Sequence, residues 1–496
     1  MSHARDLRSY LERLEEIGEV AVIDREVDWN LEIGAITRRT YETRAAAPLF
    51  TNIKDFPSGF RVLGAPAGLS AIAGQRLART ALALGLPADA DERAVVDLLA
   101  QLQRRPGIPP VAVNRTPAYD ENVLFFEEVD LLKLPTPYIH PGDGGRYIGT
   151  YGTIVSRTPD GEWVNWNIAR VMLHDRNTMS GIVSPGQHIG KLYAMWREVG
   201  EDMPFALVIG TDPAVPYFSG APQDDGVNEV DLIGSLYGEP VELACCLTND
   251  LLVPASAELV LEGRLLLDDE TEEGPMGEYQ GLLFPGSRSM KPVYRVDAMR
   301  HRDDAILPMC AAGYPAEENH VVWGLGMAAN IRKHLLDADL PIKDVFLPYE
   351  AALHWLVVSV DMDRHWPDVE KEPWSALARR IAETAFSCRG GKTPGKVIVV
   401  DDRVDVTDPH MVMWALATGN HPGHNADQLI TDVPTSPLCA YLHPEEVARH
   451  RSTKAVYNCL PHDDLPRGSV PVISDFGMFP AELRERVLTH WDSDRA

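Results

Sequence analysis

The segment EEGPMGEYQG, residues 272 to 281, carries two carboxylates, Glu273 and Glu278, on either side of a Gly-Pro-Met-Gly bend. Glycine and proline are the strongest turn formers, so the pattern predicts a tight loop. Two acids in an exposed turn are most simply explained by solvation. Two carboxylates held close together can instead acquire different pKa values and different roles in proton transfer. The segment alone favours solvation, and the rest of the chain has to decide.

A second unusual segment is VNWNIARVMLHD, residues 164 to 175, which is otherwise typical of a strand. In a strand, Asn165 and Asn167 face one side while Arg170 faces the other. Asparagine is unfavourable in strands. The two asparagines therefore indicate either a bulge at a sheet edge or a binding role.

Further polar residues lie at the starts of two expected helices. Gln187 and His188 precede a helix in SPGQHIGK, and Glu229 begins another in DDGVNEVDLIG. A glycine-containing helix N-terminus suits an anion such as phosphate. Asn165, His188 and Glu229 together offer ligands that suit Mn²⁺ or Mg²⁺, with phosphate oxygens completing the shell. Each also has a structural explanation, as a turn asparagine, a capping histidine and a glutamate that complements the helix dipole.

The loop RGGKT, residues 389 to 393, is similar to the end of a phosphate-binding P-loop. The complete motif needs glycine at position 386, where this chain has Phe386, and the loop follows no expected strand. An ATP site is therefore not expected here.

Composition narrows the class of protein. The chain has 496 residues, so two or three domains are expected, and its 45% apolar and 24% charged residues are typical of a globular protein. A formal net charge of −27 disfavours nucleic-acid binding. We expect no membrane span and no secretory signal, hence a cytoplasmic location. The six scattered cysteines are expected to be reduced thiols.

The periodicity of apolar residues predicts a mixed α/β (α+β) fold. A small α/β unit, with Ala/Leu-rich helical residues 73 to 105, precedes strand-like runs between about 120 and 300 that indicate an antiparallel or barrel-like β domain. Helix-like and strand-like runs alternate from about 320 onward, which favours an α/β layer. The expected domains are 1–115, the N-terminal α/β unit; 116–310, the central β-barrel; 311–470, the C-terminal α/β domain; and 471–496, a terminal helix that contacts a neighbouring subunit.

The chain resembles the UbiD-type decarboxylases, which use prenylated FMN. The resemblance covers nearly the whole length and is carried by NWNIAR, QHIG, GVNE, EEGPMGEYQG, GYPAEENH and KVIVVDDRVDVTD. It is strongest to the branch that acts on ferulic, phenazine, pyrrole and indole carboxylates. The resemblance implies a reversible, non-oxidative decarboxylase of an aromatic, heteroaromatic or α,β-unsaturated acid, with a split β-barrel that binds the flavin.

The resemblance also implies roles for individual residues. Arg170 would hold the substrate carboxylate, Glu278 would donate the proton, and Glu273 would pair with Arg170. The Mn²⁺ (or Mg²⁺) ligands would be Asn165, His188 and Glu229, and a K⁺ site is expected near residues 219 to 221. The cofactor-binding set would comprise Asn165, Trp166, Asn167, Ile168, Ala169, Arg170, Gln187, His188, Glu229 and Lys396. Asn319 and His320 would line the substrate pocket, although a helix N-cap explains them equally well.

Partners follow from the same resemblance: a carboxylic acid and CO₂, a flavin prenyltransferase that supplies the cofactor, and a second copy of the chain, since the family forms dimers and sometimes hexamers. Two alternatives remain open. One is an FMN-dependent oxidoreductase on a related barrel, and the other is a non-catalytic flavin-binding partner. The intact set of one arginine and two glutamates argues against the second alternative.

Overall fold

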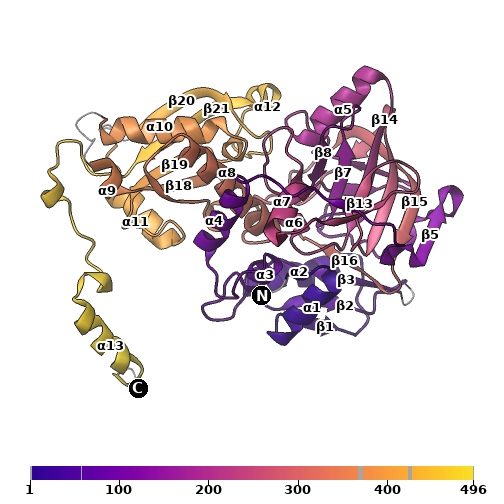
Figure 1. Ribbon diagram of the computed structural model, residues 1–496, viewed down its shortest axis with the longest axis horizontal. Coiled ribbons are helices and arrows are strands. Elements are labelled where there is room, and N and C mark those ends of the chain that lie inside the picture. Colours follow the sequence, from indigo (N-terminus) through magenta and orange to yellow (C-terminus); the bar gives the residue numbers. More distant parts are fainter. Residues whose placement is uncertain (1–2, 57–58, 367–371, 423–426, 495–496) are drawn as a thin grey trace.

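The computed structural model describes residues 3–56, 59–366, 372–422 and 427–494. Figure 1 shows a central β-rich unit, N-terminal elements packed against one end of it, and a C-terminal α/β unit beside it. A terminal segment leaves the C-terminal unit and projects away from the body. The predicted mixture of helices and sheets is confirmed.

The N-terminal unit begins with helix α1 (Leu7–Glu16), whose first turn is capped by the side chain of Asp6. Its buried residues, Leu7, Tyr10, Leu11 and Leu14, follow at spacings of three and four and so lie on one face. A four-stranded sheet lies next to this helix in the described chain. Its last strand, β16, comes from far along the sequence and pairs in parallel with β3. Its order is β1 (Val20–Ile23), β2 (Ala47–Phe50), β3 (Phe60–Gly64) and β16 (Ala305–Met309), with helices α2 (Glu32–Thr43) and α3 (Ala78–Ala83) nearby.

The central sheet contains nine strands within the described ranges, and all its pairings are antiparallel. Its order is β6 (Tyr147–Ile148), β9 (Val171–Leu173), β10 (Thr178–Gly181), β15 (Ser289–His301), β14 (Leu259–Glu273), β11 (Met203–Ile209), β7 (Thr153–Arg157) and β8 (Val164–Asn167), with β5 (Asn122–Phe125) on β15. The predicted strand-rich region is confirmed. Over the residues described, the hydrogen-bonded pairings run as a path from β6 to β8, and no pairing between these two end strands is among them.

Three helices and a small sheet flank the central strands. They are α5 (His188–Val199), α6 (Val215–Ser219) and α7 (Glu229–Tyr237), with the sheet β13 (Leu252–Pro254), β12 (Glu242–Cys245) and β4 (Val111–Ala112). The starts of α5 and α7 agree with the sequence prediction. Helices α5 and α7 both contact β8, which carries the asparagine-rich segment.

The C-terminal unit is a sheet flanked by helices, as the alternating pattern predicts. The sheet order is β17 (Ile342–Phe346), β18 (Trp355–Val360), β19 (Lys396–Asp401), β21 (Arg451–Asn458) and β20 (Asp427–Pro434). The helices are α8 (Gly324–Asp337), α9 (Met362–His365), α10 (Trp374–Ser387), α11 (Pro409–Gly419) and α12 (Pro444–Arg449).

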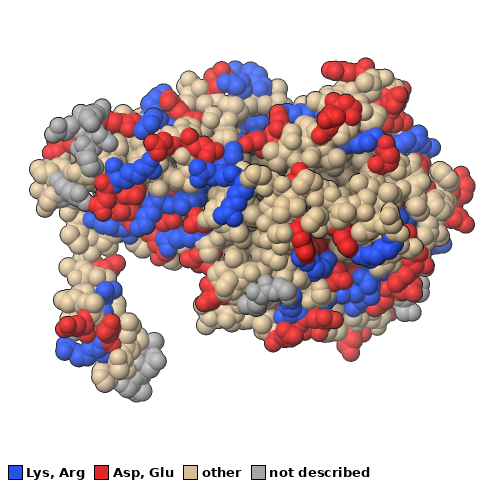
Figure 2. Space-filling view, in the orientation of Figure 1, with Lys and Arg blue, Asp and Glu red and all other residues tan. Residues whose placement is uncertain are grey.

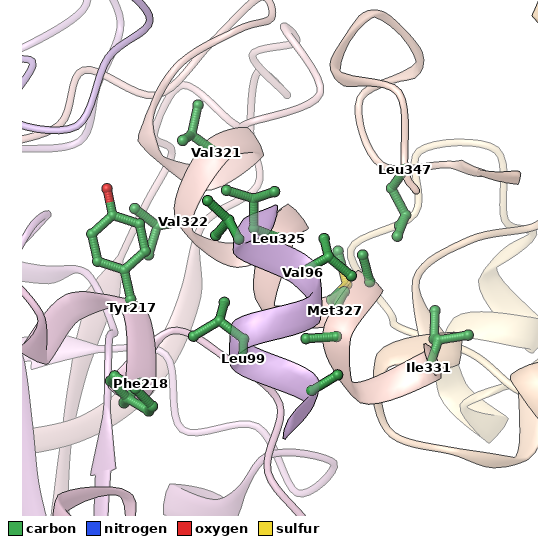
Figure 3. Packing of buried hydrophobic residues seen from close by; sticks show 14 of the residues in the cluster. Val96, Leu99, Tyr217, Phe218, Val321, Val322, Leu325, Met327, Ile331 and Leu347 are labelled. Atoms are coloured by element: carbon green, nitrogen blue, oxygen red, sulfur yellow. The ribbon is translucent and has the colours of Figure 1, made fainter. Parts of the chain in front are cut away.

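The Ala/Leu-rich segment 73–105 forms two helices, α3 and α4 (Glu92–Leu102), because Gly85 with a positive φ and Pro87 interrupt it. Helix α4 leaves the N-terminal unit and packs its apolar face on α8 (Figure 3). Val96 and Leu99 of α4 lie there among buried apolar residues of the 321–331 segment. Contacts therefore cross the predicted domain boundaries, which stay predictions.

Charged side chains of both signs are mixed on one face of the protein (Figure 2). Lys and Arg side chains are interleaved with Asp and Glu on the face shown in Figure 2. The net charge of −27 is therefore not gathered into one acidic field on that face. Among the helices of the described ranges, none combines the length and apolar character that a bilayer crossing needs.

Candidate active site

Arg170 contacts both glutamates of the turn that separates β14 from β15. Its Nε donates to Glu273 Oε1 at 3.0 Å, and its Nη1 donates to Glu278 Oε1. The Glu273 side chain is only 2% exposed, whereas those of Glu278 and Arg170 are 16% and 15% exposed. The structure therefore brings together the three residues that the sequence singled out, and it distinguishes the two acids by burial.

The backbone around the turn explains this placement. Glu273 is the last residue of β14, and Arg170 directly precedes β9, so two strands of one sheet supply the pair. The turn is fixed by Gly144 N–H donating to the Pro275 carbonyl at 2.6 Å and by Gly277 N–H donating to Asp143 Oδ1 at 3.0 Å. Gly274 has a φ of 91°, and a Cβ there would meet the Ser287 carbonyl oxygen at 2.7 Å. Glycine is therefore required at the point where the chain leaves β14.

Tyr147 is a site residue that no motif in the sequence identified. Its hydroxyl donates to Glu273 Oε1 at 2.9 Å, the same oxygen that Arg170 Nε contacts. Burial and the adjacent Glu273 carboxylate raise the pKa of Tyr147 well above its ordinary value, so the phenol stays a donor. Burial alone would lower the pKa of Arg170, but the two carboxylates outweigh it and raise that pKa. Arg170 is therefore a permanent cation between two acids.

The second group of predicted residues meets where α5 and α7 begin. His188 Nδ1 lies 3.0 Å from Asn165 Oδ1, and Glu229 accepts from the Trp166 backbone N–H at 2.8 Å. All three proposed metal ligands are buried. Burial, followed by the positive charge of Arg389, lowers the pKa of His188 to about 4, and burial raises the pKa of Glu229 to about 8. A neutral imidazole is the form that ligates metals.

Three cations lie beside this group. Arg389 and Lys191 both contact Asp225, and burial followed by the charges of Arg389 and Lys191 lowers the pKa of Lys392. The loop RGGKT thus places Arg389 and Lys392 near the expected metal ligands, although the incomplete P-loop motif argued against a nucleotide site. Glycine-rich loops with basic residues also bind phosphate outside that motif. The two glycines between Arg389 and Lys392 could therefore have indicated a phosphate site from the sequence.

The residues fit a flavin phosphate and a divalent cation. Arg389 Nε is buried without a hydrogen-bond partner in the described part of the protein, which leaves a donor for an anion. Asn165, His188 and Glu229 supply oxygen and nitrogen ligands that suit Mn²⁺ or Mg²⁺. The stretch from Asn165 to Arg170 spans at most about 17 Å of extended chain, so an elongated ligand can reach from one group to the other.

The other predicted cofactor residues lie in different surroundings, and their roles stay predictions. Residues 165 to 167 belong to β8, where Trp166 is buried in the core. Residues 168 to 170 connect β8 to β9, and the Ile168 N–H donates to the Ser219 carbonyl at 3.2 Å. Gln187 is exposed and caps α5 without a side-chain hydrogen bond. Lys396 Nζ lies 5.2 Å from the centre of the Tyr441 ring, and its proposed contact with the phosphate stays a prediction.

Asn319 and His320 begin the π-helix Asn319–Trp323, and both side chains contact Glu317. Asn319 Nδ2 donates to Glu317 Oε2 at 3.0 Å, while His320 Nδ1 lies 3.1 Å from Oε1. Neither side chain caps the helix. Cys310, Glu317 and Glu318 also place ligand atoms within 4.8 Å of one another. Glu318 accepts from Tyr41 and the Ala67 N–H, so these acids already have protein partners.

A buried lysine supports the loop that carries Arg389 and Lys392. Lys454 Nζ donates to the Gly391 carbonyl at 2.7 Å and to the Lys392 carbonyl at 3.0 Å. Burial lowers the pKa of Lys454 from 10.5 to about 7. The Lys454 side chain is 1% exposed, so it binds the backbone of the loop from the protein interior.

This burial predicts a pH dependence of stability. Below pH 7 the amine is protonated in both states. Between about pH 7 and 10.5 the unfolded chain binds a proton that the folded chain lacks, so this group makes the free energy of unfolding rise with pH. We expect the stability of the wild type relative to Lys454→Met to increase across that window in urea titrations at several pH values. A difference that does not vary with pH would contradict this; exposed Lys133→Met is the control.

Three family models match successive stretches of the chain. Models of the 3-octaprenyl-4-hydroxybenzoate carboxy-lyase family match residues 11–99 with its N-terminal domain, 111–315 with its Rift-related domain and 320–459 with its C-terminal domain. The chain is 43% identical over 491 residues to pyrrole-2-carboxylic acid decarboxylase of Pseudomonas aeruginosa, covering 98% of each chain. It is 34% identical over 498 residues to ferulic acid decarboxylase 1 of Saccharomyces cerevisiae, covering 99% of this chain and 98% of the other.

Solved structures give the same result. The UbiD-class enzyme HmfF from Pelotomaculum thermopropionicum, in complex with FMN, matches 95% of this chain and 98% of its own, with a TM-score of 0.78 and 26% identity. An evolved dimeric form of HmfF in complex with prFMN matches 97% and 99%, with a TM-score of 0.77 and 25% identity. The sequence models, the full-length relatives and the fold agree, and the chain therefore belongs to the UbiD family of carboxy-lyases.

Proposed function

We propose that this chain is a reversible, non-oxidative decarboxylase that uses prenylated FMN. Its substrate is an aromatic, heteroaromatic or α,β-unsaturated carboxylic acid. The relatives that it matches over their full length are decarboxylases of pyrrole-2-carboxylic and ferulic acid, and a similar structure holds prFMN. The observation that carries the proposal is Arg170 held between a buried and a partly exposed glutamate.

The reaction sets the chemical requirements. Loss of CO₂ leaves an electron pair on carbon, and RCOO⁻ + H⁺ → RH + CO₂ consumes one proton per turnover. When bound, the prenylated flavin supplies the electron sink. The chain must then bind a carboxylate, deliver one proton to carbon and recover that proton from water.

The three residues divide these tasks by charge and exposure. Arg170, a permanent cation, binds the substrate carboxylate through its guanidinium fork. Glu278, in its protonated form, gives the proton, and its partial exposure allows it to be reprotonated from solvent. Glu273 is almost fully buried and shares one oxygen with Arg170 and Tyr147, so it orients the guanidinium. The same steps in reverse carboxylate the product when CO₂ is abundant.

Cofactor retention would rest on the second group of residues. Asn165, His188 and Glu229 would bind Mn²⁺ or Mg²⁺, and Arg389 and Lys392 would contact the phosphate. A K⁺ ion near residues 219 to 221 is part of the proposal, since the Ser219 carbonyl lies beside the backbone at Ile168. Lys396 stays a sequence-based prediction.

Co-production with a flavin prenyltransferase tests the function. We expect purified protein with a flavin absorbance, a bound divalent metal and prenylated FMN in the mass spectrum of the extract. Unmodified FMN that is reduced by a nicotinamide would instead support the oxidoreductase. Protein that retains flavin but converts no acid would support the non-catalytic alternative.

The terminal segment supports the proposed homodimer. Helix α13 (Ala481–Asp494) has 14 residues, too few for a stable isolated helix in water. Val472 and Leu488 on this segment are 74% and 63% exposed, and the segment projects from the body (Figure 1). A second copy of the chain would bury these apolar side chains.

We expect deletion of residues 479–496 to halve the mass measured by light scattering, because it removes this contact. Leu488→Asp, a smaller change, should weaken the dimer at low protein concentration. An unchanged mass for both variants would show that the segment does not hold the dimer.

A further inference from the structure

Asp225 connects the two sides of the proposed cofactor site. Its Oδ1 lies 3.0 Å from His188 Nε2 and 3.1 Å from Arg389 Nη1, and its Oδ2 accepts from Lys191 Nζ at 2.5 Å. One carboxylate thus contacts a proposed metal ligand and two of the cations near the proposed phosphate position. Nothing in the sequence distinguished this residue from its neighbour Asp224.

The contact to His188 has a consequence for the other ring nitrogen. A neutral imidazole carries one N–H, and a carboxylate at Nε2 favours the tautomer with that hydrogen on Nε2. Nδ1 then presents a lone pair to Asn165 Oδ1, 3.0 Å away. The Asn165 oxygen is turned toward His188 because its Nδ2 donates to Asn167 Oδ1 at 3.0 Å. Two acceptors that face each other at this distance suit a cation bound by both.

We propose that Asp225 is a positioning residue for the metal and phosphate site. It holds His188 in the tautomer that turns the Nδ1 lone pair toward Asn165 Oδ1, and it fixes Lys191 and Arg389 next to that site. Outer carboxylates that orient ligating histidines recur in metalloproteins and raise metal affinity. The inference rests on the proposed function, because it deepens the cofactor site named there.

The loop around Asp225 is anchored well enough for this role, although the Asp225 side chain is 57% exposed. On one side, Asp224 accepts from Lys333 Nζ at 2.9 Å, which ties the loop to α8. On the other, the Val227 carbonyl accepts from Trp163 Nε1 at 3.1 Å, and Asn228 Oδ1 accepts from the Val164 N–H at 3.0 Å. Asp225 therefore lies between two fixed points of the backbone.

A competing explanation predicts the opposite result. Asp225 could occupy the cations and exclude an incoming phosphate, in which case its removal would strengthen anion binding. Under our proposal its removal weakens metal binding, because His188 loses its orientation and the cations lose their common partner. The two explanations therefore differ in the sign of the effect.

Mn²⁺ binding measured by electron paramagnetic resonance on the full-length protein, with and without FMN, provides the test. We expect Asp225→Ala to weaken Mn²⁺ binding by roughly 10–100-fold, the usual effect of losing such an outer carboxylate. Asp225→Asn keeps an acceptor oxygen for Nε2–H and should lose less. The matched control is Asp224→Asn, which removes a neighbouring charge but keeps an acceptor oxygen for Lys333 and has no contact with His188, so its Mn²⁺ affinity should equal that of the wild type.

The melting temperature of each variant shows whether it is folded, and titrations with FMN and riboflavin measure flavin binding. Unchanged Mn²⁺ affinity in Asp225→Ala would overturn the positioning role and leave the proposed function intact. So would tighter binding of FMN by Asp225→Ala without tighter binding of riboflavin, which lacks the phosphate. An equal loss in Asp224→Asn would also overturn it, since the effect would then come from the loop as a whole. If the wild type binds no Mn²⁺ in either condition, the proposed metal site and this inference fail together.

Discussion

Glu278→Gln is expected to retain flavin and metal while losing most turnover. The amide preserves the size of the side chain and an acceptor for Arg170, but it has no proton to give to carbon. Loss of a general acid typically costs roughly 10²–10⁴-fold in rate. The same variant should lose exchange of deuterium into the product carbon, because that exchange uses the same proton transfer in reverse.

The turn itself offers a control for this prediction. Glu272 is exposed, with 65% of its side chain accessible, and its carboxylate lies 3.7 Å from Arg288. Glu272→Gln should therefore match the wild type in rate and exchange. Rate is measured by product formation and exchange by mass spectrometry. Unchanged turnover in Glu278→Gln would show that Glu278 is not the proton donor.

Arg170→Met is expected to damage both stability and activity. Removing one partner of a buried ion pair leaves the other charge uncompensated, which typically costs about 3–5 kcal/mol. Here the residue left behind is Glu273, whose side chain is 2% exposed. Loss of the guanidinium also removes the group that binds the substrate carboxylate, and we expect a further fall of roughly 10²–10³-fold in kcat/KM, comparable to the loss of one preorganised donor.

Two further variants separate these effects. Arg170→Lys keeps the charge but loses the planar fork, so it should recover stability in thermal unfolding more fully than it recovers activity. Arg176→Met, six residues further along the chain and largely exposed, should resemble the wild type in both measurements. An Arg170→Met protein with wild-type melting temperature and wild-type kcat/KM would contradict the proposed arrangement.

The sequence predicted the central features of this site because they lie in short segments. Arg170 lies just after a strand with two asparagines, and Glu273 and Glu278 lie on one glycine-proline turn, so local pattern and resemblance were enough. The structure adds that Glu273 is the buried member and that Tyr147 shares its oxygen. Tyr147 lies over a hundred residues from that turn, in a two-residue strand without a motif. The pairing of β6 with β9 and the hydrogen bonds of Asp143 and Gly144 to the turn bring it there.

The residues near the proposed phosphate position were not predicted from local sequence patterns. Lys396 was selected from the resemblance alone; its ammonium lies 5.2 Å from the centre of the Tyr441 ring, and its contact with the phosphate stays a prediction. Arg389 and Lys392 lie near His188 because the end of α10 returns to the central unit, a long-range contact that no local pattern encodes. The division of residues 73–105 was also missed, although Gly85 and Pro87 indicated it. Location and oligomeric state stay predictions because they depend on molecules outside the chain.

The most direct test of the account is a decarboxylation assay in D₂O. The full-length chain, co-produced with a flavin prenyltransferase, would be given pyrrole, indole, phenazine and cinnamic-type acids. With the wild type, we expect at least one acid to release CO₂ and to gain one deuteron at the carbon that carried the carboxylate. With Glu278→Gln at equal flavin content, we expect neither. Flavin-loaded, metal-containing wild-type protein that leaves every acid unchanged and unlabelled would contradict it.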